Sequence, residues 1–202
     1  MQLFETIRLD EGDFPRLSYH KSRMMRSAEA LGFIFNEQQW TQCIETVLRE
    51  HNTGKYRVKL LLNKDGTMDT VIAEMTDKQR FTAKLQQVVS QVNQHYIINK
   101  TSERAHLMHN YQTDLVLLYN EDGKILEFDI GNVMIKEKGQ YFTPKYQEDF
   151  LRGCMRQEML DQGKLFLKDY DVNELKSKLN SGEAQLFLIN SLREVAEVEI
   201  YL

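Results

Sequence analysis

The chain has 202 residues, 42% of them hydrophobic and 28% charged, which is enough for one sizeable domain or two small ones. Its net charge of -4, with basic residues spread along the chain, argues against the concentrated basic face of a nucleic-acid-binding protein. A mean hydropathy of -0.52 and short apolar runs argue against a membrane span. These properties leave small molecules and proteins as partners.

The two cysteines, Cys43 and Cys154, lie far apart and form no CxxC pair, so we expect both to be reduced. Met1 leads into "QLFETIRLD" without a basic and then apolar leader, which predicts a cytoplasmic protein. The histidines show no metal-ligand spacing, and we expect no metal. They are His20, His51, His95, His106 and His109.

The first part of the chain is predicted to be mixed in structure. Leu3 to Leu9 has strand character, and His20 to Leu31 has helical periodicity, with Ser18 as a possible cap and Gly32 as the stop. A second helix begins after Asn36, which can cap it, and ends at Asn52-Thr53-Gly54.

Two strand-like runs around Asp65-Gly66 give the best short hairpin signal in the chain. The polar stretch from Thr76 to Arg80 is the candidate boundary between two lobes, 1–78 and 79–202.

The second lobe is predicted to be richer in strands. "AKLQQVVSQVNQHYIIN" has extended character, Lys100 to about Tyr111 favours a short helix, and strands turning at Asp122-Gly123 and Lys138-Gly139 follow. The remaining predicted elements are a helix near Gly153 to Gln162, a strand at Lys164 to Lys168, a helix near Val172 to Leu179 and the strand "AQLFLIN".

Seven short motifs occur in one order along the chain: "FETIR", "HKSRM", "NKTSER", "LEFDIGNV", "YFTP", "LRGCMRQ" and "LINSLREV". In this order they resemble fold-type IV pyridoxal-phosphate (PLP) enzymes, the class IV aminotransferase family. That family contains branched-chain and D-amino-acid aminotransferases and 4-amino-4-deoxychorismate lyase. The resemblance covers almost the whole chain and implies a mixed α/β fold, with a small N-terminal lobe and a larger, barrel-like C-terminal lobe that carries most of the cofactor site.

The resemblance gives Lys100 the catalytic role, as the lysine that forms a Schiff base with the cofactor aldehyde. A deprotonated amine is needed for that attack, and partial burial beside cations favours it. Glu127 matches the carboxylate that keeps the pyridine nitrogen protonated. By composition alone, Lys100 is more typical of a surface lysine at a helix start, and Glu127 of the outward residue of an alternating strand.

The resemblance also implies a phosphate-binding set. Arg23 matches an arginine that grips the phosphate, and the helix start in "RGCMR" offers backbone N–H groups to the same charge. Many relatives carry threonine where this chain has Met155, so one hydroxyl is missing. The implied cofactor-binding residues are Arg23, Lys100, Glu127, Asn132, Cys154, Met155, Ser191 and Leu192, although Asn132 is equally typical of an ordinary turn.

Four further residues are weaker candidates for substrate contacts. Thr6 matches a position that lies close to the substrate in the lyase branch, and Arg104 follows Lys100 at the family spacing. Arg57 and Lys59 alternate on one side of "YRVKLLL" and could bind a carboxylate, although exposed strand charges explain them as well.

The resemblance implies a PLP-dependent enzyme that forms a homodimer, and two reactions remain open. One is pyruvate elimination from an aminated chorismate, giving 4-aminobenzoate, which "FETIR" and the Lys100 to Arg104 spacing favour. The other is amino transfer to a 2-oxo acid. Because the chain starts close to "FETIR", we expect substrate specificity to be affected more than cofactor binding. A catalytically lapsed member acting as a binding module is the third alternative.

Overall fold

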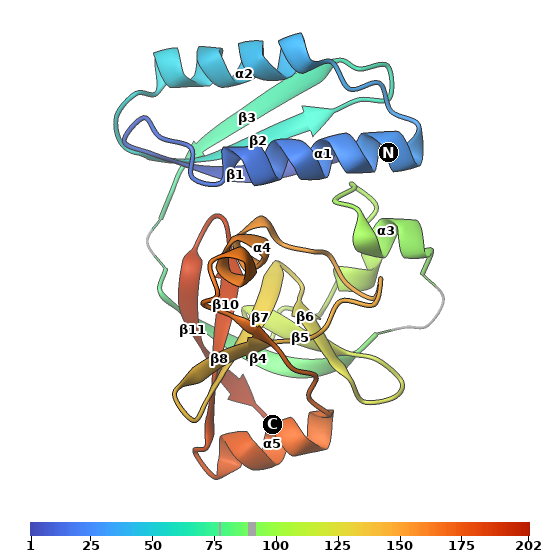
Figure 1. Cartoon of the computed structure of the whole chain (residues 1–202), viewed down its shortest axis with the longest axis vertical. Coiled ribbons are helices and arrows are strands. Elements are labelled where there is room, and N and C mark those ends of the chain that lie inside the picture. Colours follow the sequence, from blue (N-terminus) through green and yellow to red (C-terminus); the bar gives the residue numbers. More distant parts are fainter. Residues whose placement is uncertain (77, 89–91) are drawn as a thin grey trace. The chain divides into compact units, whose positions relative to one another are not determined.

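The computed structural model describes residues 1–76, 78–88 and 92–202, and Asp77 in the predicted boundary stretch lies outside them. The chain divides into two compact units (Figure 1). Unit 1 consists of Met1–Asp77 and Asn99–Glu103, and unit 2 of Lys78–Ile98 and Arg104–Leu202. Lys100 therefore belongs to unit 1, whereas the sequence placed it in the C-terminal lobe.

Unit 1 is a three-stranded antiparallel sheet with two helices packed on one face. Its strands run in the order β1-β2-β3, with bounds Leu3–Asp10, Lys55–Leu62 and Met68–Glu74. Helices α1 (Leu17–Leu31) and α2 (Glu37–Glu50) run along this sheet in Figure 1. Alternate residues of β1 and β2 form one apolar core with Met24, Trp40 and Ile44 of the helices.

The ends of both helices follow from local chemistry. Gly32 ends α1 in the left-handed conformation, and the Asn36 side chain caps α2 by accepting hydrogen bonds from two backbone N–H groups, as predicted. The predicted Ser18 cap is wrong. Helix α1 begins earlier, at Leu17, after Arg16 in a left-handed conformation.

Residues 99–103 join unit 1 by pairing with the free edge of β1. The backbone N–H of Phe4 donates to the carbonyl of Lys100 over 3.0 Å, and that of Ser102 donates to the carbonyl of Gln2 over 2.8 Å. These bonds take the place of the helix predicted from Lys100 to Tyr111, of which only a 3-10 turn at Ala105–Leu107 forms.

Unit 2 is built on an eight-stranded sheet in the order β10-β11-β4-β5-β6-β7-β8-β9. Strands β7 and β10 also pair, from Asn132 opposite Ile189 to Glu137 opposite Ala184, and this pairing closes six strands into a barrel. The strand bounds are β4 Arg80–Gln87, β5 Leu115–Tyr119, β6 Ile125–Phe128, β7 Gly131–Glu137, β8 Gln140–Thr143, β9 Phe166–Leu167, β10 Ala184–Asn190 and β11 Glu194–Tyr201.

Three α-helices accompany the barrel in the described part of unit 2: α3 (Gln94–Ile98), α4 (Cys154–Asp161) and α5 (Val172–Asn180). The last two confirm predictions, but "HYIIN" was predicted as extended and instead forms α3, because the Asn93 side chain caps it through the N–H of His95. Residues 89–91 of that predicted run lie outside the described residues. No helix of the described ranges is long and apolar enough to cross a membrane.

Candidate functional site

Strand β1 carries a carboxylate in its apolar register. Its odd-numbered residues are buried under the helices, and Glu5 occupies one of these positions with 1% exposure. A carboxylate is almost never fully buried without a partner. The partners of Glu5 come from α1, where His20 and Arg23 are both buried.

The three side chains form one hydrogen-bonded cluster. Arg23 donates from Nε to Glu5 Oε1 over 2.8 Å and from Nη2 to Oε2 over 2.5 Å, so the contact is bidentate. His20 Nδ1 lies 2.7 Å from the same Oε2. The predicted phosphate-gripping residue Arg23 is therefore held side-on by a carboxylate of its own unit.

The charge states in this cluster follow from burial and pairing. Burial alone would raise the pKa of Glu5, but Arg23 and His20 outweigh burial and bring it to about 2. Burial lowers the pKa of His20; Glu5 opposes this shift, and the positive charges of Arg23 and Lys100 add to it. A neutral His20 must donate its Nδ1–H to Glu5. Lys100 is thus close enough to His20 to act on it electrostatically.

The face of the unit 1 sheet that points away from the helices carries the remaining predicted residues of this unit. The ammonium groups of Lys59 and Lys100 lie 4.5 Å and 4.8 Å from the centre of the Phe4 ring. Thr6 pairs directly with Lys59 across β1 and β2, so it shares this face. Arg57, two pairs further along and therefore on the same face, is exposed.

In unit 2, Glu127 and Asn132 face each other across β6 and β7. Both side chains are buried, with 5% and 2% exposure. The loop before α4 connects them: the N–H of Leu151 donates to Glu127 Oε1 over 3.2 Å, and Asn132 Nδ2 donates to the carbonyl of Leu151 over 2.9 Å.

The N-terminus of α4 lies against Asn132. The N–H of Gly153 donates to Asn132 Oδ1 over 2.8 Å. A side chain at this position would displace the Asn132 amide, because a Cβ atom would lie 2.2 Å from the same oxygen. Helix α4, which is described in full, has no acidic residue in its first turn and no side-chain cap. Its dipole therefore favours an anion there.

Cys154 and Met155 begin α4, and both are buried. The Met155 side chain packs with Met134 and Ile189 in a small apolar cluster. Met155 thus fills space beside the helix start, where it has no hydroxyl to offer.

Ser191 and Leu192 form the turn after β10. The Asn190 side chain accepts hydrogen bonds from the N–H groups of Leu192 (3.0 Å) and Arg193 (2.7 Å). Its amide donates to the carbonyl of Ile130 over 3.2 Å, which ties this turn to the turn before β7. Leu192, one of the predicted cofactor-binding residues, therefore donates its N–H to Asn190.

Arg104, the weak substrate candidate, belongs to unit 2. Its Nη2 donates to the backbone carbonyl of Asp129 over 3.5 Å, in the turn between β6 and β7. The Asp129 side chain in turn accepts from the N–H of Val116 over 3.0 Å. Arg104 thus contacts the turn that follows Glu127.

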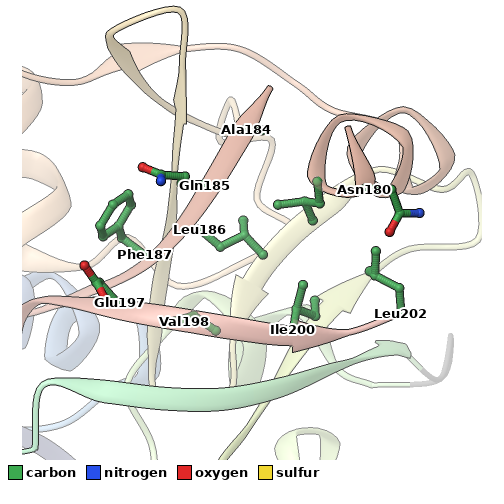
Figure 2. A pocket seen from close by; sticks show the side chains of 10 residues that line it. Asn180, Ala184, Gln185, Leu186, Phe187, Glu197, Val198, Ile200 and Leu202 are labelled. Atoms are coloured by element: carbon green, nitrogen blue, oxygen red, sulfur yellow. The ribbon is translucent and has the colours of Figure 1, made fainter. Parts of the chain in front are cut away.

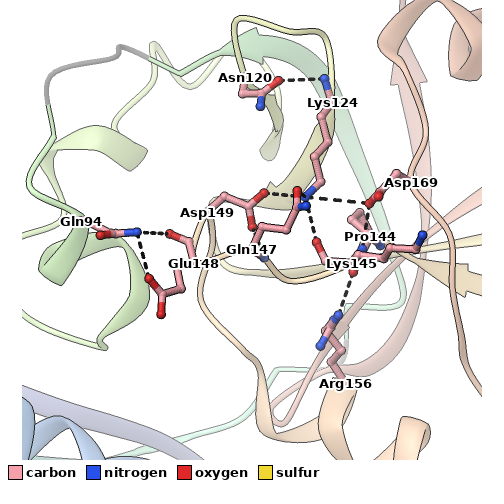
Figure 3. A network of polar contacts seen from close by, with 10 residues as sticks. All are labelled: Gln94, Asn120, Lys124, Pro144, Lys145, Gln147, Glu148, Asp149, Arg156 and Asp169. Carbon is pink, nitrogen blue, oxygen red and sulfur yellow. Dashed lines mark hydrogen bonds and ion pairs between the residues drawn. The ribbon is translucent and has the colours of Figure 1, made fainter.

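A polar network holds the loop that precedes α4 (Figure 3). Lys124 is its hub, with a side chain 13% exposed and an ion pair to Asp149 of 2.5 Å. Arg156, buried in the first turn of α4, donates to the carbonyl of Pro144 over 2.7 Å. Burial lowers the pKa of Arg156 to about 10, so its positive charge is kept at neutral pH. The Lys124 ammonium also contacts the Lys145 carbonyl, Gln147 and Asp169.

A hollow of about 350 Å³ lies elsewhere on unit 2, between α5, β10 and β11 (Figure 2). It is lined by apolar residues such as Leu186, Val198 and Ile200, at the ends of β10 and β11 opposite to the Ser191 turn. None of the predicted site residues lines it. We therefore do not assign the site to this hollow.

Unit 1 contains Thr6, Arg23 and Lys100, with Arg23 on the helix face of its sheet and the other two at the opposite face. Unit 2 brings together Glu127, Asn132 and the start of α4. Sequence reasoning missed Glu5 and His20, although both lie in quoted motifs. A glutamate at an inward position of an apolar alternation was the available signal.

Comparison with known proteins agrees over the length of the chain. The family model described as amino-transferase class IV matches residues 2–201. A curated protein of Schizosaccharomyces pombe (strain 972 / ATCC 24843), named "Putative aminodeoxychorismate lyase", is 33% identical over 208 residues, which are 96% of this chain and 87% of that protein.

Solved structures share the fold. The structure of a "Putative amino-acid aminotransferase from Mesorhizobium loti" is 28% identical, with a TM-score of 0.83 and 99% of each chain covered. A branched-chain aminotransferase from Thermoproteus uzoniensis is 20% identical, with a TM-score of 0.79 over 98% of this chain and 77% of that chain. The chain described here belongs to the class IV aminotransferase family of PLP-dependent enzymes.

Proposed function

We propose that this protein binds PLP and eliminates pyruvate from 4-amino-4-deoxychorismate, giving 4-aminobenzoate. The observation that carries this proposal is the 33% identity, over 96% of the chain, to a protein named as an aminodeoxychorismate lyase. The buried and charged groups of both units support it, because their donor set suits a phosphate and a protonated pyridine ring.

Unit 1 supplies an amine and a phosphate ligand in this proposal. Lys100 Nζ would hold the cofactor at its aldehyde, and the same amine would carry the proton at the substrate carbon that bears the amino group. Arg23 binds the phosphate with the N–H groups that do not face Glu5. Both cations lower the pKa of His20, which supports the joint role.

Unit 2 supplies a carboxylate and a helix N-terminus. Glu127, oriented by the Leu151 N–H, keeps the pyridine nitrogen protonated. When bound, PLP supplies the electron sink for the reaction. The start of α4, at Cys154 and Met155, binds the phosphate, and Asn132 fixes that helix start through Gly153. Asn190 orders the turn of Ser191 and Leu192, to which we assign a second set of contacts with the cofactor.

Lys59 is better placed than Arg57 to bind a substrate carboxylate. Its ammonium lies over the same ring as that of Lys100 and is half-buried, whereas Arg57 is exposed. Thr6, opposite Lys59, is a neighbouring hydroxyl donor for the same substrate. Arg104 acts on the site through the Asp129 turn.

Aminotransfer is the second candidate function, and the 28% identity to the Mesorhizobium loti protein over the full chain favours it. A steady-state assay separates the two reactions, because transamination needs a 2-oxo acid acceptor and shows ping-pong kinetics. We expect pyruvate release without any acceptor. Turnover that depends on an acceptor would instead identify an aminotransferase.

Cofactor binding is tested by colour and reduction. The purified protein with PLP should absorb in the near-ultraviolet to visible range, and borohydride should fix the cofactor on Lys100. Lys100→Ala should abolish both signals, whereas Lys64→Ala, at an exposed lysine of the β2–β3 turn, should change neither. A colourless protein that takes up no PLP would favour the binding-module alternative.

We also propose a cytoplasmic homodimer with a small amino compound as its substrate, on the strength of the family resemblance. Size-exclusion chromatography with light scattering measures the assembly directly. A mass twice that of the chain is expected, and a monomer at micromolar concentration would contradict the proposal.

A further inference from the structure

Glu5 and His20 have no role in the proposed chemistry, yet both are almost completely buried beside Arg23, with 1% exposure each. We propose that Glu5 and His20 are positioning residues, which hold the Arg23 guanidinium in the orientation that binds the cofactor phosphate. This inference rests on the proposed function of the protein as a PLP enzyme, and it adds two residues to the machinery.

The first argument is the geometry of the ion pair. A guanidinium is planar, so a carboxylate bound side-on through Nε and Nη2 fixes the orientation of that plane. The edge formed by Nη1 and Nη2 points away from that carboxylate. Because the plane is fixed in advance, less side-chain entropy is lost when the edge binds an anion.

The second argument is the part played by His20. Its neutral ring donates Nδ1–H to the oxygen that also accepts from Arg23 Nη2, so the carboxylate is held from two directions. His20 and Arg23 are three residues apart on α1 and therefore lie on the same face of the helix. One turn of helix thus supplies both groups that meet Glu5.

The third argument concerns the contribution of the cluster to the free energy of folding. A buried ion pair contributes little net stability compared with apolar residues of similar volume, and breaking it is strongly unfavourable. Stability alone gives no reason for Glu5 at an inward position of β1, where its neighbours in register are Leu3, Ile7 and Leu9. Holding an arginine for an anion does give a reason.

The test compares PLP with pyridoxal, which has the same aldehyde and ring but no phosphate. In the wild type, PLP should bind more tightly than pyridoxal, as measured by the absorbance of the bound form. Glu5→Gln should reduce this preference by about tenfold, because Arg23 loses its fixed plane, while pyridoxal affinity stays within about twofold.

Glu37→Gln is the matched control. It also neutralises a glutamate that pairs with a cation of α1, Lys21, but Glu37 is exposed with 68% of its side chain accessible. We expect an unchanged preference for PLP. A fall in the Glu37 variant equal to that in the Glu5 variant would overturn the inference, since general electrostatics would then explain both.

A second pair of variants applies if Glu5→Gln does not fold. His20→Asn keeps a donor near the Nδ1 position and should keep the preference, whereas His20→Leu removes it and should lower the preference about threefold. If a variant lost equal affinity for PLP and for pyridoxal, or if no variant lost affinity, the cluster would have only a structural role. A wild type that binds neither compound would instead refute the proposed function.

Discussion

Glu5 in unit 1 and Glu137 in unit 2 are both buried carboxylates, and the pKa of each lies at about 2. The groups that keep them ionised differ. Glu5 is held by Arg23 and His20, which come from one helix and are themselves buried. Glu137 accepts from Lys168, Lys178 and Tyr170, at 2.6, 2.7 and 2.7 Å.

The two clusters differ in how easily water can replace a lost partner of the carboxylate. The two lysines at Glu137 have side chains 35% and 19% exposed, so water reaches their side of the cluster. Around Glu5 no described partner is solvated to that extent, since Arg23 is 8% exposed and His20 is 1% exposed. Although the two pKa values are equal, the ionised state of Glu5 depends more strongly on each single partner than that of Glu137 does.

The largest effect on stability is expected for Arg23→Met. It leaves the Glu5 carboxylate buried with only a neutral histidine donor, and removing one partner of a buried pair typically costs about 3–5 kcal/mol. Urea denaturation should show this loss in the free energy of unfolding. The double variant Glu5→Leu/Arg23→Met should recover most of it, because no buried charge remains. A double variant as unstable as Arg23→Met would contradict this account.

The second-largest effect is expected from acid, which should weaken the Glu5 cluster. The folded-state pKa of about 2 lies below the ordinary 4.5, so this contribution is complete above pH 4.5 and is lost as pH falls toward 2. Its full size is on the order of 3 kcal/mol. Urea midpoints from pH 6 to pH 3 measure it. In Glu5→Gln the urea midpoint should depend less steeply on pH. An equally steep dependence in that variant would show that other groups cause the loss of stability in acid.

The Lys124 hub gives an intermediate prediction for unit 2. Lys124→Met removes a cation that binds one carbonyl and the side chains of Gln147 and Asp149, so the loop before α4 should loosen. Hydrogen exchange at the N–H groups of Leu151 and Gly153 should become faster by about tenfold, equivalent to about 1.4 kcal/mol. Lys164→Met, at an exposed lysine after α4, is the control.

The same substitution, Lys124→Met, should also reduce the affinity for the cofactor. The Leu151 and Gly153 amides bind Glu127 and Asn132, so a looser loop should weaken PLP binding by several-fold. Unchanged exchange with weaker PLP binding would mean that Lys124 acts by its charge and not by fixing the loop.

Local signals made much of the fold predictable. Asn36 caps α2 through its own side chain, Gly32 ends α1 in the left-handed conformation, and Asp65-Gly66 turns the β2–β3 hairpin. Each feature depends on residues within a few positions of one another. The "HYIIN" error was also local, because the two isoleucines favour extended structure and the preceding Asn93 cap was overlooked.

Contacts between distant segments were beyond local signals. Lys100 joins unit 1 through a hydrogen bond with Phe4, and no spacing in the chain indicates that pairing. The Glu5 cluster joins a strand to a helix in the same way. Strand β11 was missed, although Glu197 and Glu199 alternate with the buried Ala196 and Val198 in the pattern of a half-buried strand. The family motifs supplied the candidate residues, but not the partners that orient them.

The smallest effect is expected for Lys178→Met, the counterpart of Arg23→Met in unit 2. Glu137 raises the pKa of Lys178 through their hydrogen bond, but Lys168 and Tyr170 still bind the carboxylate when that bond is lost. We therefore expect a loss below about 1 kcal/mol in urea denaturation, as for partly exposed pairs. Lys168→Met/Lys178→Met should cost more than the sum of the single variants, because only then does the buried charge lose both cations. Strict additivity would mean that the lysines act independently, and that the cluster at Glu137 is no more tolerant of substitution than the one at Glu5.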